Sequence, residues 1–215
     1  MSQQAKQTRS TLLALLVIGV LLLAIFAVLS LRGSLNAPLP TPTRASGVIP
    51  VEPPIETHDF SLPGSSGEML SLSDLRGKWT LLFFGYTHCP DFCPLTLASW
   101  KNIKTALGSD GDKLNYLFIS VDGERDTPEV MRQYLSRFDL AFVGMTGDAA
   151  TLAQIGPDYG LDYTLHTEEG ANYSVDHTTR VYLLDPQSRM VYEFAFGTDQ
   201  DAVVATIRGQ LNSAS

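Results

Sequence analysis

The sequence from residue 55 to the C-terminus alternates short apolar runs with segments that carry helix-start signals. The apolar run at residues 78–86 is typical of a buried strand, and Pro94 stands where a proline opens a helix. Repeated alternation of this kind predicts an α/β domain with a largely parallel central sheet. Further strands are expected at 114–121, 141–145, 180–184 and 190–196, and helices at 94–107, 128–138, 148–159 and from 198 onward.

Both ends of the predicted domain add antiparallel pairs to this pattern. The last two strands flank the turn Asp185–Ser188, which predicts an antiparallel edge on a mixed sheet. Ahead of the sheet, residues 58–62 and 68–72 predict a small hairpin around Gly64–Gly67. The fold class expected is therefore α/β, with a central mixed sheet flanked by helices and an extra N-terminal hairpin.

The segment Ser10–Leu31 contains no charged residue and consists mostly of Leu, Val, Ile and Ala. As a helix it would span about 33 Å, enough for a hydrocarbon core of about 30 Å. The apolar part of a cleaved signal peptide is shorter, roughly 7–15 residues, and a cut after Ala37 would leave Pro38 as the next residue. We therefore expect a cytoplasmic N-terminus at 1–9 and one uncleaved transmembrane anchor at 10–32.

Between the anchor and the domain, residues 33–54 hold six of the twelve prolines, which predicts a stiff, extended linker. None of the 23 acidic residues lies in residues 1–47, whereas four of the 15 basic residues do. The domain is therefore strongly acidic, which argues against nucleic acid as a partner because phosphates would be repelled. The acidic excess favours solubility or docking to a basic partner surface.

The chain has two cysteines, Cys89 and Cys93, separated by three residues at the end of an apolar run. A structural disulfide here would close a very small loop, with a chain-entropy contribution of only roughly 2 kcal/mol. A redox dithiol is a second interpretation, because Cys93 is expected at a helix N-terminus, where thiolate is favoured. Redox motifs of the C-x-x-C type have two intervening residues, however, and a thiol peroxidase would need a Thr three residues before its cysteine, whereas Thr87 is two before Cys89.

A metal site is the third interpretation of the cysteine pair. Two thiolates and the imidazole of His177 would form a three-ligand set for Cu(I), because soft thiolates select soft cations. Structural zinc takes four ligands, and the fourth would have to be an acid or His88, which is adjacent to Cys89 and expected to point away. His177 could instead be a loop histidine bonded to backbone. From these residues alone, the redox dithiol and the metal site both remain open.

Three segments, Gly85–Pro94, Ile119–Pro128 and Tyr173–Pro186, together form a pattern. They resemble, in this order, the cysteine signature, the strand-end segment and the histidine segment of the Sco/SenC family, the copper chaperones of cytochrome oxidase assembly. The order and spacing of the three agree, the resemblance covers residues 55–215, and the predicted anchor fits the family as well.

The resemblance implies a thioredoxin-like, copper-binding domain at residues 55–215. It implies one copper ion per domain, Cu(I) or Cu(II), bound by Cys89, Cys93 and His177. Asp122 falls where the family has an aspartate close to the metal, so it is expected beside the site or as a weak ligand. The sequence departs from the family at Gly123, where a proline is common.

The resemblance also implies a function, a location and partners. The protein is expected to be a carrier rather than an enzyme, and to deliver copper to the binuclear copper centre of cytochrome c oxidase subunit II. It would be a single-pass protein of a bacterial-type inner membrane, with its domain in the periplasm, and would need an upstream copper donor. A thiol reductant is expected too, because a Cys89–Cys93 disulfide could not bind copper in this way. The alternative is a thiol-disulfide oxidoreductase that reduces the oxidase's copper-site cysteines, or a redox sensor.

Overall fold

The computed structural model describes residues 47–213, together with Gly19, Leu21, Leu23 and Phe26, which are helical. Residues 1–43 and 44–215 form two separate compact units, and only the second is described further. The predicted N-terminus, the anchor at 10–32 apart from those four residues, and the linker before Gly47 thus lie outside the described residues. Among the residues that are described, no helix is long and apolar enough to span a membrane.

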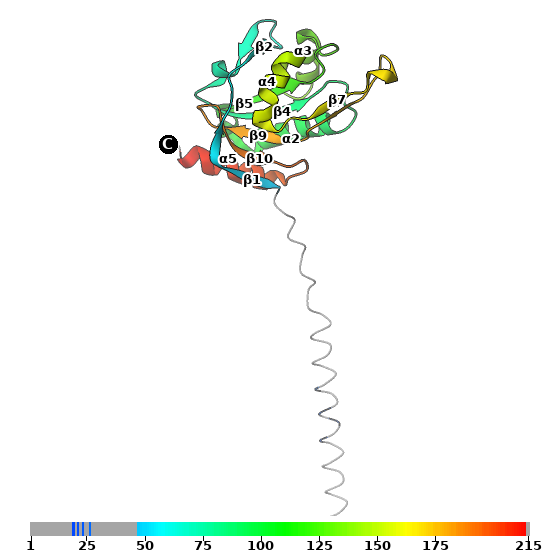
Figure 1. Cartoon of the computed structure of the whole chain (residues 1–215). Helices are drawn as coiled ribbons and strands as arrows, with labels where there is room; N and C mark the ends of the chain where they lie inside the picture. Colours follow the sequence, from blue (N-terminus) through cyan, green and yellow to red (C-terminus); the bar gives the residue numbers. More distant parts are fainter. Residues whose placement is uncertain (1–18, 20, 22, 24–25, 27–46, 214–215) are drawn as a thin grey trace, which may run out of the picture. The chain divides into compact units, whose positions relative to one another are not determined.

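A mixed sheet forms the centre of the domain (Figure 1). Within residues 47–213 it has six strands in the order β1-β10-β9-β4-β5-β6. Strands β4, β5 and β6 are parallel, whereas β9, β10 and β1 join by antiparallel pairing. This confirms the predicted parallel centre with an antiparallel edge. The strands are β1 (Val48–Glu56), β4 (Trp79–Gly85), β5 (Leu114–Ser120), β6 (Phe142–Thr146), β9 (Val181–Leu184) and β10 (Arg189–Phe194).

Strand β1 corrects the predicted boundary between linker and domain. The linker was expected to continue to Pro54, but from Val48 onward the chain pairs with β10, with a break in register between Pro50 and Ile55. Proline lacks the N–H needed for a central strand, yet β1 is an edge strand, where one side makes no ladder. A proline-rich composition therefore does not distinguish a tether from an edge strand.

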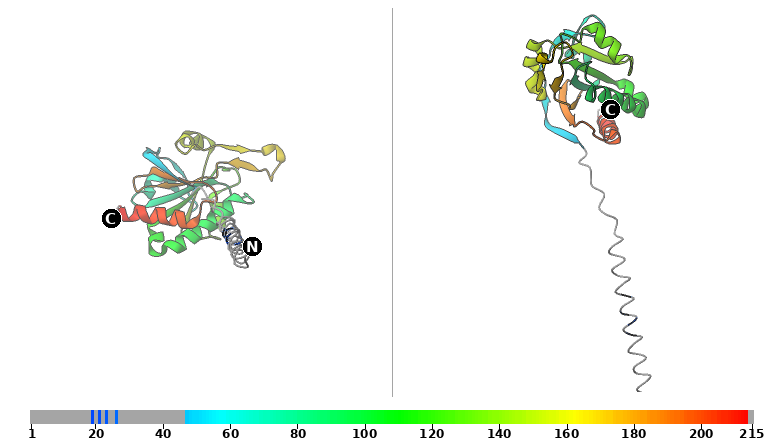
Figure 2. Two further views of the ribbon diagram at one scale, coloured as in Figure 1. Left: turned by 90° about the horizontal axis from the view of Figure 1, so that it is seen from below. Right: turned by 90° about the vertical axis from the view of Figure 1, so that its right-hand side faces the viewer.

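Helices cover both faces of the sheet. On one face, Phe83 of β4 contacts Trp100 of α2, and α5 packs against α2. On the opposite face, Phe84 contacts Tyr159 of α4, because successive residues of a strand point to opposite sides. Figure 2 shows α5 (red) and α4 (yellow-green) on opposite sides of the sheet. The helices are α2 (Phe92–Leu107), α3 (Pro128–Leu135), α4 (Ala149–Tyr159) and α5 (Gln200–Ser213), with 3-10 turns η1 (Leu72–Leu75), η2 (Gly108–Lys113) and η3 (Thr167–Glu169).

The helix starts follow the expected capping chemistry. The Thr127 hydroxyl oxygen accepts a hydrogen bond from a backbone N–H of α3, and Pro128 is the first residue of that helix. Asp148 caps α4 by accepting bonds from two backbone N–H groups. Gly160 ends α4 in the left-handed region, at φ 55°, which a glycine adopts without steric cost.

Two short hairpins flank the sheet. The first, β2 (Ser61–Pro63) with β3 (Met69–Ser71), confirms the predicted N-terminal hairpin. The second, β7 (Tyr163–Leu165) with β8 (Val175–His177), was not predicted. We call residues 163–177 the β7–β8 arm; Figure 1 shows it projecting from the domain. Its strands have three residues each and no apolar run, so they carry little periodic signal.

Candidate metal centre

The two cysteines lie where central strand β4 turns into helix α2. Every residue of β4 is buried, and the chain turns after Gly85 so that Cys93 falls in the first turn of α2, as predicted. The Cys93 backbone N–H donates to Cys89 Sγ over 3.5 Å, and both side chains are buried. Gly85 is required here, because a Cβ at this position would lie 2.8 Å from Cys93 Sγ. Both thiols are free.

His177 reaches the cysteines from the end of β8. Its Nε2 lies 3.6 Å from Cys93 Sγ, although the two residues are 84 positions apart in the chain. The ligand atoms of Cys89, Cys93 and His177 all lie within 4.8 Å of one another. In the described part of the chain, this is the one group of three or more His, Cys, Asp or Glu side chains close enough to hold a metal ion.

The orientation of the imidazole suits metal binding. Nδ1 of His177 lies 2.9 Å from the carbonyl oxygen of Thr178, so an Nδ1–H donates there and the Nε2 lone pair faces the sulfurs. The rings of Phe83 and Tyr86 stand edge-on to the imidazole, each with its centroid 5.8 Å away. Two sulfurs and one oriented imidazole nitrogen form a donor set that fits a soft, low-coordinate cation such as Cu(I).

The two cysteine pKa values are driven in opposite directions. The pKa of Cys89 is lowered to about 3, chiefly because the Cys93 thiol donates a hydrogen bond to its sulfur, with backbone N–H groups adding to the effect. Burial, followed by the adjacent Cys89 sulfur, raises the pKa of Cys93 far above its usual range. The metal-free site therefore holds one thiolate and one thiol, and metal binding must release the remaining proton.

Asp122, which the resemblance places beside the site or as a weak ligand, anchors the β7–β8 arm. Its buried carboxylate accepts hydrogen bonds from the Tyr173 hydroxyl and from Arg125 Nε, each at 2.5 Å. Arg125 also donates to the Tyr173 carbonyl oxygen over 2.8 Å, and its guanidinium lies 3.5 Å from the centroid of the Tyr173 ring. Asp122 is outside the ligand group, so it contributes by fixing the residue from which the chain enters β8.

A second buried carboxylate, Asp126, holds the cysteine turn, and the sequence analysis did not identify it. It accepts hydrogen bonds from the Thr87 backbone N–H, the Thr87 hydroxyl and the Ser120 hydroxyl, at 2.9, 2.5 and 2.6 Å. Thr87 is thereby fixed two residues before Cys89. His88 is exposed, with Nδ1 3.8 Å from Asp126, and lies outside the ligand group, as predicted. The available signal in the sequence was that Asp126 directly precedes the helix cap Thr127, but polar residues at such positions usually face solvent.

The comparisons with known proteins agree with this geometry. The family model described as SCO1/SenC matches residues 51–212, a range that includes part of β1. The chain belongs to the SCO1/SenC family. SCO1 homolog 1 of Arabidopsis mitochondria is 36% identical over 150 residues, which make up 67% of this chain and 43% of that protein. The chain thus spans less than half the length of this SCO1 relative.

Solved structures of Sco proteins share the fold. The structure of Bradyrhizobium japonicum ScoI with copper bound is 39% identical, with a TM-score of 0.65, and the match covers 71% of this chain and 97% of that one. BsSco, described as a member of the Sco family of cytochrome c oxidase assembly proteins with a disulfide switch, is 20% identical, with a TM-score of 0.61 over 75% of this chain and 96% of that one. The central mixed sheet thus matches the thioredoxin-like structures of Sco proteins.

The departure from the family at Gly123 has a steric reason in this Sco domain. A Cβ at Gly123 would lie only 2.4 Å from the backbone oxygen of Gly147. The loop that follows β5 therefore passes against the end of β6 without room for a side chain. Asp122 remains fully buried next to this glycine, so the loop is held in place by its carboxylate bonds despite the missing proline.

The Sco metal centre opens to the surface through a cleft of about 260 Å³. Cys89 and His177 line the cleft, whereas Cys93 is fully buried beneath it. The acidic residues Asp91 and Asp176 also line it, and both are exposed. A metal held by the three ligand atoms would therefore be reached from this side, at a negatively charged mouth.

Proposed function

We propose that this protein is a membrane-anchored copper carrier that delivers copper to the binuclear copper centre of cytochrome c oxidase subunit II. The observation that carries the proposal is the convergence of Cys89, Cys93 and His177 within 4.8 Å at the end of β4. Membership of the SCO1/SenC family supports it, because a related Sco structure has copper bound and the Sco family is described as one of cytochrome c oxidase assembly proteins. The ion is the protein's cargo, one per domain.

The ligand set suits transfer better than permanent storage. The Cys89 and Cys93 sulfurs bind as thiolates, and His177 binds through Nε2 while Nδ1–H stays bonded to Thr178. Three ligands on one side leave the copper open toward the cleft. A partner that offers thiolates and imidazoles can therefore approach the ion from that side before the first ligands depart.

Loading requires both cysteines to be reduced, as they are in the structure. A Cys89–Cys93 disulfide would remove both thiolates, so an oxidising compartment would oppose copper binding. The proposal therefore includes a separate thiol reductant and an upstream copper donor as partners.

The predicted anchor determines where in the cell the carrier would act. We propose that residues 10–32 cross a bacterial-type inner membrane once and that the domain lies in the periplasm. The chain before Val48 would then tether the domain and raise its effective concentration near a membrane-bound acceptor. The absence of acidic residues from residues 1–47 supports a division between anchor and acidic domain.

A second candidate function is reduction of the acceptor's copper-site cysteines. The lowered pKa of Cys89 and the buried Cys93 beneath it favour this reading, because a thiolate next to a resolving thiol can exchange with a disulfide. In that reaction the Cys89 thiolate attacks the partner disulfide, which forms a mixed disulfide and releases one partner thiol. Cys93 then attacks Cys89 Sγ, so that a Cys89–Cys93 disulfide forms, the second partner thiol leaves, and two electrons have passed to the partner. His177 has no essential part in this chemistry.

One experiment separates the two functions. The full chain in detergent, and its His177→Ala variant, are mixed with the soluble copper domain of subunit II, either metal-free and reduced or as its disulfide. The carrier function predicts that His177→Ala abolishes copper transfer but leaves disulfide reduction within about twofold. His88→Ala, which changes the exposed neighbour of Cys89, is the matched control and should transfer copper normally. Efficient copper transfer by His177→Ala would contradict the carrier proposal.

A further inference from the structure

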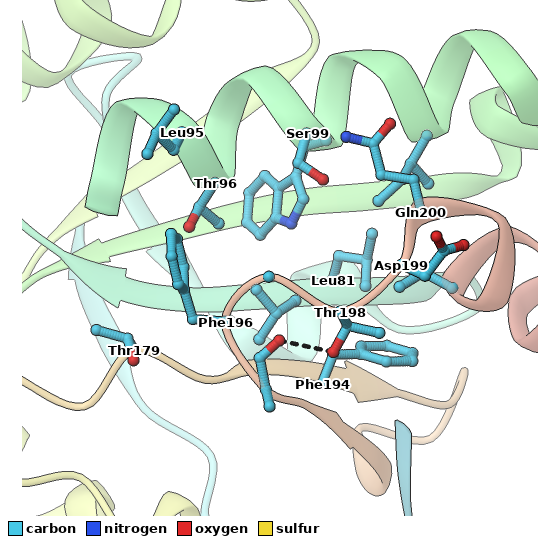
Figure 3. A pocket seen from close by; sticks show the side chains of 16 residues that line it. Leu81, Leu95, Thr96, Ser99, Thr179, Phe194, Phe196, Thr198, Asp199 and Gln200 are labelled. Atoms are coloured by element: carbon cyan, nitrogen blue, oxygen red, sulfur yellow. Dashed lines mark hydrogen bonds between the residues drawn. The ribbon is translucent and has the colours of Figure 1, made fainter. Parts of the chain in front are cut away.

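A second hollow lies next to the metal cleft. It is a cavity of about 410 Å³ between α2, the segment that follows β10 and the start of α5. Figure 3 shows Leu95 and Thr96 of α2 on one side of this cavity and Phe196 and Thr198 on the other. Thr179 lines both this cavity and the metal cleft, so the two hollows are neighbours on one surface.

The cavity contains a buried donor without an acceptor. Trp100 lines the cavity and is 1% exposed, and its Nε1 has no hydrogen-bond partner among the described residues. A buried N–H without a partner is unfavourable, and native structures contain few of them. The Trp100 indole therefore points to a ligand that supplies an acceptor oxygen.

Exposed apolar side chains connect the cavity with the metal centre. Phe92, Leu95 and Phe196 are 45%, 58% and 42% exposed, although each is large and apolar. The Phe92 and Phe196 rings meet edge to face, with centroids 4.8 Å apart. Phe92 lines the metal cleft, whereas Leu95 and Phe196 line the cavity. Clustered exposed apolar residues of this kind typically mark a protein interaction surface.

The charged residues that line the metal cleft and the cavity are all acidic. Asp91 and Asp176 line the metal cleft, and Asp199 lines the cavity. Among the described residues, no Lys or Arg lines either hollow. An apolar centre with an acidic rim is complementary to a partner with an apolar anchor surrounded by basic residues.

We propose that the cavity and its apolar rim, defined by Leu95, Trp100, Phe196 and Thr198, form the docking groove for the protein that receives copper. The acceptor inserts one aromatic or long aliphatic side chain, and a carbonyl or carboxamide oxygen beside that side chain accepts a hydrogen bond from Trp100 Nε1. This inference rests on the proposed carrier function. A protein that brings its own ligands to the cleft must cover Phe92, and the groove continues directly from there.

The first test compares copper-transfer rates. Full-length protein in detergent is loaded with Cu(I) and mixed with increasing amounts of the metal-free copper domain of subunit II. The double variant Leu95→Ser/Phe196→Ser is expected to lower the second-order transfer rate about tenfold. Its own copper affinity should remain unchanged, because neither residue contacts a ligand atom. Leu140→Ser, which removes an exposed leucine ahead of β6 at the other end of the sheet, should transfer copper like the wild type.

The outcomes of this test are distinguishable. If the wild type transfers copper and the double variant does so at the same rate, the docking groove is overturned and the carrier function stands. If the wild-type protein keeps its copper in the presence of the acceptor, the carrier function itself fails, and the docking groove fails with it.

The second test observes the Trp100 indole directly. The chain has two tryptophans. Trp79 is the first residue of β4, at the end of that strand away from the cysteine turn, so its indole ¹⁵N–¹H signal is an internal control. Adding the acceptor domain should shift the Trp100 signal downfield as its N–H gains an acceptor, and leave the Trp79 signal in place. An unchanged Trp100 signal would overturn the proposal. So would a shift produced by raising the concentration of the protein alone, which would assign the groove to a second copy.

Discussion

The cysteine turn and the β7–β8 arm supply the same metal centre but are built differently. The cysteine turn follows a strand in which every residue is buried, and it leads directly into α2. The arm consists of two strands of three residues with several exposed positions, including Asp176 beside the ligand His177. Two ligands are therefore part of the central framework, whereas the third is delivered from the periphery.

Each region is held by its own buried carboxylate from the loop after β5. Asp126 bonds to Thr87 and so fixes the cysteine turn, whereas Asp122 bonds to Tyr173 and so fixes the arm. Loss of a contact in the arm should thus weaken the histidine's contribution and leave the cysteines in place. We therefore expect the two sulfurs to decide whether copper binds, and the arm to decide how firmly it is held.

The largest expected effect is the loss of a sulfur ligand. Cys89→Ser or Cys93→Ser should lower Cu(I) affinity by about 1000-fold or more, because a hydroxyl is a poor ligand for a soft cation. Competition with a Cu(I) chelator measures the affinity, and X-ray absorption counts the sulfurs. Two sulfurs per copper in either variant would exclude the assignment of the framework ligands.

The next effect is the loss of the peripheral ligand. His177→Ala should weaken Cu(I) binding by more than about 100-fold. This exceeds the loss of metal affinity, about 10–100-fold, that is typical when a residue that only hydrogen-bonds to a ligand is replaced. The free energy of unfolding should change by less than about 1 kcal/mol, because the arm lies outside the central sheet. His166→Ala, on the same arm but bonded to Asp176, is the control. An unchanged affinity in His177→Ala would remove the imidazole from the site.

A smaller effect is expected when only the anchor of the arm is weakened. Tyr173→Phe removes the hydroxyl that donates to Asp122 and should lower Cu(I) affinity about tenfold. It should also lower the free energy of unfolding by about 1–2 kcal/mol, because a buried acceptor loses a partner. Tyr163→Phe removes a hydroxyl from the same arm and leaves the Asp122 bond intact. Equal affinities for the two variants would show that Asp122 does not act through the arm.

The smallest expected effect is that of pH on the alkylation of Cys89, whose rate should stay nearly constant. Because the pKa of Cys89 is lowered to about 3, its thiolate is already formed above that value and is lost only as the pH falls through it. The rate at which Cys89 of the metal-free protein is alkylated should thus vary less than about twofold between about pH 5 and 8. For a thiol with a pKa of about 8.5, the rate would instead rise nearly tenfold for each pH unit. Mass spectrometry of the labelled peptide gives the rate at each cysteine. A tenfold rise per pH unit at Cys89 would contradict the hydrogen bond from Cys93.

The predicted elements that the structure confirms have strong local signals. The buried run before the cysteines, the Thr127 and Asp148 caps and the position of Cys93 at a helix start all follow from neighbouring residues. Two elements were missed because their local signals were weak or misleading. Prolines in β1 indicated a linker, and the arm's strands are too short to show a period.

By itself, the sequence determined the α/β class, the two sulfur donors and the resemblance that pointed to copper. These depend on patterns that are local to single segments, and on the order of those segments along the chain. Only the tertiary structure decided that His177 reaches Cys93 across 84 positions, that Asp122 serves the arm, and that Asp126 serves the cysteine turn. Such contacts depend on the packing of distant segments, because burial and orientation decide whether a carboxylate faces a metal, a backbone N–H or solvent.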